Sequence, residues 1–177
     1  MSGLFDDLCA YDGKAVTLLS EAEKRHGSGP AYITELVVLS ASDVGHVSNG
    51  ATWLLKAAAE NGVALTPDQT RALIQNLPEI CDWLAQLHIC QMLGFMAVPA
   101  AGAANVAAWL SDLLGHKRPF LRAWSMSALC SLAAQHADFA SQAEAALEVA
   151  NADPAASVRA RARGAEKAYQ PLGRRQR

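Results

Sequence analysis

Apolar residues recur along most of this chain at intervals of three and four positions, a spacing that places them on one face of an α-helix. Residues 119–136 show it most clearly, because Pro119 stands at the first turn and Leu121, Leu129 and Leu132 share one side. The few β-branched clusters lie within helical spacing, so the sequence predicts an all-α protein. A short acidic segment at 1–12 precedes the further helices expected over 13–26, 31–40, 47–61, 67–76, 78–96, 105–114, 139–151 and 155–169.

Two connections carry local signals. Thr66, Pro67 and Gln69 match a capping box, in which Thr66 accepts a hydrogen bond from the third helical amide and Gln69 reaches back to the amide of Thr66. Residues 98–104 are rich in Ala and Gly after a proline, and we expect a loose connection there.

The helices repeat with a regular period. Leu36, Leu73, Leu110 and Leu147 follow one another at intervals of 37 residues, one in the first helix of each pair, and the second helices align at intervals of 38, 36 and 37. Helix pairs of this period cannot bury their apolar faces alone, which predicts a right-handed α-solenoid of about four helical hairpins. We therefore expect one domain over 1–170, with a disordered basic tail at 171–177. Its parts are an N-terminal cap and partial repeat at 1–26 and repeats at 27–62, 63–97, 98–136 and 137–170.

The later second helices share a local pattern: Leu121-Arg122 follows a proline and precedes small residues and Ala-Leu, and Val158-Arg159 stands in the equivalent place. This pattern resembles the second helices of HEAT repeats, a family related in architecture to armadillo repeats. The two earlier second helices depart from this pattern, with Val47-Ser48 and Ala85-Gln86. The resemblance implies that second helices line a concave surface, which in such proteins is the usual binding surface.

One row of side chains is predicted to face that surface. If Leu121 and Leu129 point into the core, Trp124 and Ser127 point away from it, and the equivalent positions elsewhere hold aromatic, imidazole, amide and guanidinium groups. Such groups gathered on a concavity are typical of a recognition site. An alternative remains open, in which the tryptophans pack between repeats. The predicted partner-binding residues are Trp53, His88, Gln91, Trp124, Ser127 and Arg161.

The uneven distribution of charge along the chain suggests a second possible function, nucleic-acid binding. Residues 1–115 hold 5 Lys or Arg against 12 Asp or Glu, whereas residues 116–177 hold 10 against 5. The basic end could contact nucleic acid, and HEAT-like folds include alkylpurine DNA glycosylases; it could equally be the polar cap that a solenoid end requires. The predicted row holds no Asp or Glu, which disfavours a glycosylase-type enzyme. The candidate nucleic-acid contacts are Arg122, Arg159, Arg163 and Lys167.

Other chemistry finds little support. No apolar run approaches the roughly 20 residues of a membrane span, and the N-terminus lacks signal-peptide character, so we expect a cytoplasmic protein. Cys81, His88 and Cys90 do not share one helix face, so no metal site is predicted. No Gly-x-Ser-x-Gly sequence or phosphate-binding loop occurs. The sequence therefore predicts a non-catalytic module without a cofactor, whose partner is another protein. All four cysteines, Cys9, Cys81, Cys90 and Cys130, are expected to be reduced and buried.

Overall fold

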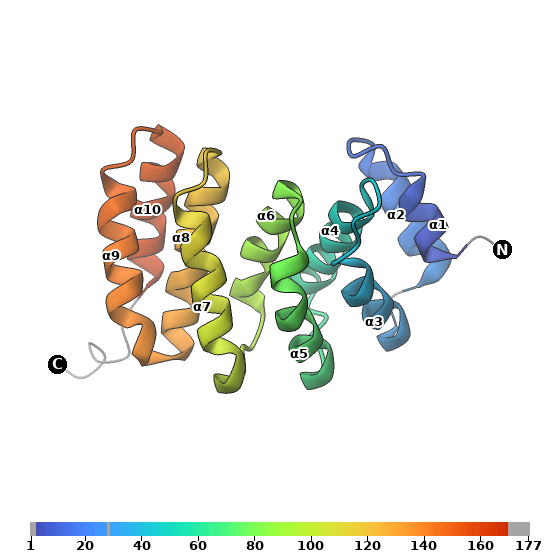
Figure 1. Ribbon diagram of the computed structural model, residues 1–177, viewed down its shortest axis with the longest axis horizontal. Coiled ribbons are helices and arrows are strands. Elements are labelled where there is room, and N and C mark those ends of the chain that lie inside the picture. Colours follow the sequence, from blue (N-terminus) through green and yellow to red (C-terminus); the bar gives the residue numbers. More distant parts are fainter. Residues whose placement is uncertain (1–2, 28, 170–177) are drawn as a thin grey trace. The chain divides into compact units, whose positions relative to one another are not determined.

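The computed structural model describes residues 3–27 and 29–169, which form α-helices and short 3-10 helices without any β-strand (Figure 1). The all-α prediction is therefore confirmed for these residues. Contacts divide the chain into two compact units, residues 1–96 and residues 97–177. The predicted repeat boundaries within a single domain stay a prediction, and the predicted disordered tail at 171–177 lies outside the described residues.

Helix α4 is the centre of the first unit, because it packs against α1, α2, α3 and α6. Its buried face includes Leu54 and Leu55, which are each 1% exposed. Burying side chains of this size contributes roughly 1.5–3 kcal/mol each. The unit consists of α1 (Leu4–Cys9), α2 (Val16–His26), α3 (Pro30–Leu39), α4 (Val47–Glu60), α5 (Pro67–Asn76) and α6 (Trp83–Met92), with 3-10 turns η1 (Leu77–Glu79) and η2 (Leu93–Phe95).

The capping box at the start of α5 is confirmed. The Thr66 Oγ1 accepts from the Gln69 amide at 3.3 Å, and the Gln69 Oε1 accepts from the Thr66 amide at 2.9 Å. The Gln69 Nε2 also donates to the Pro30 carbonyl at 3.0 Å and to the Thr34 hydroxyl at 2.9 Å. Gln69 therefore both completes the capping box of α5 and holds α5 against α3.

The single helix predicted over 78–96 is wrong. Pro78 lies in the 3-10 turn η1, and α6 begins only at Trp83. The Asp82 carboxylate accepts hydrogen bonds from the Leu84 and Ala85 amides, both at 2.9 Å, and so satisfies the first donors of a new helix.

Helix α8 is the centre of the second unit and packs against α7, α9 and α10. The expected loose connection at 98–104 is wrong, because α7 begins at Ala100, directly after Pro99. Alanine has the highest intrinsic helix propensity, and the run of alanines extends the helix toward its start. The unit consists of α7 (Ala100–Leu114), α8 (Pro119–Gln135), the 3-10 turn η3 (Ala137–Phe139), α9 (Ala140–Asn151) and α10 (Ala156–Ala168).

All four periodic leucines are buried, as predicted. Leu36 and Leu110 are 0% exposed, Leu73 is 1% exposed and Leu147 is 7% exposed. They lie in four different helices, α3, α5, α7 and α9. The interval of 37 residues therefore joins buried core positions, and the arrangement of the helices as repeats stays a prediction.

The four cysteines differ in burial. Cys90 and Cys130 are buried free thiols, but Cys9 and Cys81 are free and exposed, so their predicted burial is wrong. Cys9 ends the short helix α1 and Cys81 lies in the connection before α6, where less of the chain covers them.

Among the described residues, no helix combines the length and apolarity that crossing a membrane requires.

Candidate functional site

Two cavities follow one another along the contact between α8 and α10. The larger, of about 390 Å³, is lined by Phe120, Ala123 and Trp124 of α8 and by Ser157, Ala160, Arg161 and Gly164 of α10. The smaller, of about 120 Å³, is lined by Ser127, Cys130, Ser131 and Ala134 of α8 together with Ala165, Ala168 and Tyr169. We call the two together the α8/α10 groove.

Helix periodicity explains which side chains line this groove. Trp124 and Ser127 are three positions apart on α8 and are partly exposed, whereas Leu121 and Leu129 on the same helix are fully buried. Arg161 occupies the equivalent side of α10 and is also partly exposed. The three groove residues predicted in this part of the chain therefore lie along one groove, and their role in binding a partner stays a prediction.

Arg161 is held by an aromatic ring. Its guanidinium carbon lies 3.5 Å from the centroid of the Trp124 ring, a cation–π arrangement. No described side chain or carbonyl accepts a hydrogen bond from this guanidinium. Desolvation lowers the pKa of Arg161, yet an arginine remains charged at neutral pH. Stacking fixes the plane of the group and leaves its N–H donors along the edge available to a carboxylate or phosphate.

The other polar side chains of the groove carry hydroxyl or thiol groups, which can donate or accept hydrogen bonds. The Tyr169 hydroxyl is buried and has no hydrogen-bond partner among the described residues. Desolvation raises the pKa of Tyr169, which keeps the hydroxyl protonated. Neither cavity is lined by Asp or Glu. The groove thus combines apolar walls with donors and one cation, a composition that suits an anionic group attached to an apolar one.

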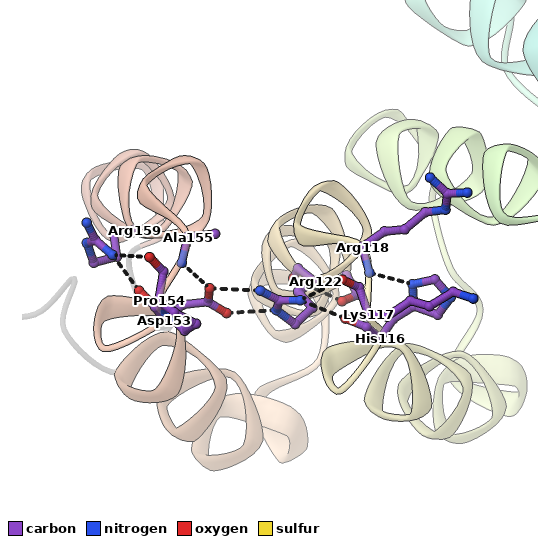
Figure 2. A network of polar contacts seen from close by, with 9 residues as sticks. His116, Lys117, Arg118, Arg122, Asp153, Pro154, Ala155 and Arg159 are labelled. Carbon is purple, nitrogen blue, oxygen red and sulfur yellow. Dashed lines mark hydrogen bonds and ion pairs between the residues drawn. The ribbon is translucent and has the colours of Figure 1, made fainter.

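A separate polar network joins the connections before α8 and α10 (Figure 2). The Arg122 Nε donates to the Asp153 Oδ2 at 2.8 Å, and the Arg122 Nη2 donates to the Asp153 Oδ1 at 2.9 Å. The Arg122 Nη1 donates to the His116 carbonyl at 2.8 Å. The hydrogen bonds from Arg122 lower the pKa of Asp153, so the two side chains form an ion pair at neutral pH. This pair couples the two hairpins of the second unit.

The network changes the nucleic-acid hypothesis. Arg122 is neutralised by Asp153, and Arg159 donates to the carbonyls of Asp153 at 2.6 Å and Pro154 at 2.9 Å. Both arginines therefore have internal structural roles, and their predicted contact with nucleic acid stays a prediction. Arg163 and Lys167 are exposed on α10, so two of the four candidate residues keep an accessible charge.

A third cavity, of about 370 Å³, lies beside the Arg122–Asp153 pair. Its lining is mainly apolar and includes Leu114, Met126 and Val149. The two charged side chains at this cavity satisfy each other. Gln142 also lines it, with its Nε2 donating to the Ser111 hydroxyl. This cavity therefore has no unpaired cation comparable to Arg161.

The predicted site residues of the first unit divide into two kinds. Trp53 and Gln91 are partly exposed, but His88 is only 8% exposed, so its predicted exposure is wrong. The His88 ring lies between α4 and α6, with its Nδ1 atom 3.2 Å from the Thr52 hydroxyl. Burial, followed by the charge of Lys56, lowers the pKa of His88 to about 4. His88 is therefore a neutral residue of the helix–helix interface.

Two groove residues were missed by sequence reasoning. Phe120 is 60% exposed and lies four positions before Trp124, so helical spacing could have identified it. Tyr169 follows the last residue of α10 and turns its hydroxyl inward; no local pattern indicates this. Both enlarge the aromatic lining of the α8/α10 groove.

No metal centre or homologue adds to this picture. Among residues 3–27 and 29–169, no group of three or more His, Cys, Asp or Glu side chains is placed to hold a metal ion. No known protein family, curated protein or solved structure matches the chain. The functional argument therefore depends on the geometry and chemistry of the α8/α10 groove.

Proposed function

We propose that this chain is a HEAT-like α-solenoid that acts as a non-catalytic interaction module and binds another protein through its second helices. The interval of 37 residues between buried leucines supports the repeat interpretation. Direct packing of consecutive second helices, α4 on α6 in one unit and α8 on α10 in the other, is the arrangement expected of stacked hairpins.

The observation that carries the proposal is the stack of Arg161 on Trp124 within a partly apolar cavity. Tryptophan and arginine are enriched among the residues that dominate protein interfaces. Phe120 lies on the same cavity and exposes 60% of its surface, which a partner would cover with a gain in free energy.

Catalysis in this groove is poorly supported. Cys130 is the strongest nucleophile among its lining residues, but burial raises the pKa of Cys130 to about 12. At neutral pH this side chain is a thiol, whereas the thiolate is the nucleophilic form. The groove also lacks the carboxylate that a glycosylase-type enzyme would place beside its substrate.

The proposal is tested by capturing partners from cells that produce the protein and measuring the affinity of the partner obtained. Trp124→Ala should weaken binding by at least about 1 kcal/mol, or roughly fivefold. Gln75→Ala should leave affinity unchanged, because Gln75 is exposed on α5, which is not one of the proposed binding helices. Circular dichroism must show that both variants keep their helical content. Equal binding by the wild type and Trp124→Ala would contradict the proposal, and a steep loss of DNA binding with salt would favour nucleic acid instead.

A further inference from the structure

We infer that the α8/α10 groove takes a short, extended, acidic peptide segment, with an Asp or Glu carboxylate on Arg161 and a neighbouring bulky apolar side chain against Phe120 and Trp124. This inference rests on the proposed function and specifies the chemistry of the partner.

The need for a carboxylate follows from the state of Arg161. Its guanidinium is partly desolvated by stacking on Trp124, yet it has no acceptor among the described residues. Donors in this condition gain most from a charged acceptor, and the planar edge of a guanidinium matches the two oxygens of a carboxylate. No Asp or Glu of the groove competes for this position.

The apolar neighbour follows from the walls of the larger cavity. Apart from Ser157 and Arg161, its lining consists of Phe120, Trp124 and small residues. Its volume of about 390 Å³ is near the small end of ligand pockets, which suits one or two side chains more than a folded surface. The cavity is open at Gly164, where an added Cβ atom would meet no atom within 4 Å.

The length of the groove sets the length of the segment. From Phe120 to Ala134 the axis of α8 rises by about 20 Å, which an extended chain covers with roughly six residues. Farther along α8 lies the smaller cavity, which Ser127, Ser131 and Tyr169 help to line.

The charge distribution of the second unit favours the same partner. Helices α7 and α9 contain Asp112, Glu144 and Glu148 but no Lys or Arg. In contrast, α8 and α10 contain four arginines and Lys167, with Glu166 as their single acidic residue. An acidic segment is therefore attracted to the α8 and α10 side. A peptide fits better than nucleic acid because the anion site adjoins an apolar cavity and two of the arginines are engaged internally.

The test is an array of short synthetic peptides in which acidic, basic and apolar positions are varied, probed with the full-length protein. We expect enrichment of peptides that place Asp or Glu beside Leu or an aromatic residue. For the best such peptide, Arg161→Gln should weaken binding about tenfold, equivalent to about 1.4 kcal/mol. Arg163→Gln, which removes the same charge from an exposed position on the same helix, should change affinity less than about twofold.

A blocking variant avoids the risk of misfolding. Gly164→Leu should abolish peptide binding while the melting temperature stays unchanged or rises, because leucine has the higher helix propensity and the added Cβ meets no neighbouring atom. Equal losses from Arg161→Gln and Arg163→Gln would overturn the inference. So would displacement of the peptide by a short single-stranded oligonucleotide at lower concentration than by a second acidic peptide.

The two proposals fail differently. Peptide binding that requires Trp124 but shows no acidic preference overturns the acidic-peptide inference and leaves the interaction module intact. Absence of peptide binding, together with partner capture that Trp124→Ala does not weaken, overturns both.

Discussion

His88 provides a test of how α4 and α6 pack, through the pH dependence of stability. Its side chain is 8% exposed, and burial lowers its pKa from 6.5 to about 4. The folded state therefore keeps the ring neutral in a range where the unfolded chain binds a proton. This stabilisation is fully present above pH 6.5 and is lost as the pH falls from there toward 4.

The size of the effect follows from the two pKa values of His88. Between pH 7.5 and pH 5.5, the unfolded imidazole changes from mostly neutral to mostly protonated, while the folded imidazole stays mostly neutral. Linkage then predicts a loss of about 1 kcal/mol in the free energy of unfolding. Urea unfolding, followed by far-UV circular dichroism at both pH values, measures this loss for the wild type and for His88→Gln.

The comparison between the two proteins isolates His88 from the other histidines. We expect the free energy of unfolding of the wild type to fall by about 1 kcal/mol more than that of His88→Gln over this range. His88→Gln can lower stability at both pH values without affecting this difference. An identical pH dependence in the two proteins would show that His88 titrates as an exposed side chain, and would refute its burial between α4 and α6.

The other predictions concern the core, a helix cap, the ion pair and the tail. Leu110→Ala should lower the free energy of unfolding by about 2–5 kcal/mol, whereas Val149→Ala, at a position 69% exposed, should change it by less than about 0.5 kcal/mol; urea titration distinguishes them. Thr66→Ala removes the capping box and should cost about 1 kcal/mol in the same assay. Asp153→Asn should lower the urea midpoint at pH 7 and have less effect near pH 3. The reason is that the pKa of Asp153 is lower in the folded protein than in the unfolded chain, where it is near 3.9. The ion pair therefore stabilises the fold at pH values above 3.9, and this stabilisation is lost as the pH falls through the pKa of the folded state. Deleting residues 171–177 should leave the melting temperature nearly unchanged, and a drop of many degrees would show that they pack on the body.

Local signals predicted most of the helices and the buried leucines. Apolar spacing identified α8 because one side of it is consistently buried, and Thr66 with Gln69 identified the start of α5 because both hydrogen bonds of a capping box are local. The break at Asp82 was missed because apolar residues continue on both sides of it. A cap that interrupts an apolar run gives no change in hydrophobicity.

Contacts between helices decided the residues that sequence reasoning misplaced. Helix α6 has apolar side chains around most of its circumference, so its pattern could not show that His88 faces α4. Arg122 and Asp153 are 31 positions apart, and only the packing of two hairpins brings them together. Trp124 and Arg161 were placed on one surface by the repeat period, but their direct stacking depends on the geometry of α8 against α10.

Site-specific photo-crosslinking tests most directly whether the α8/α10 groove binds another protein. A photoreactive amino acid is placed at Ser127, which lines the groove, or at Gln75, which is exposed on α5. After irradiation of cells that produce the protein, we predict a crosslinked partner from position 127 that is lost when Trp124→Ala is added, and none from position 75. A partner that crosslinks from position 75 but not from position 127 would contradict the account.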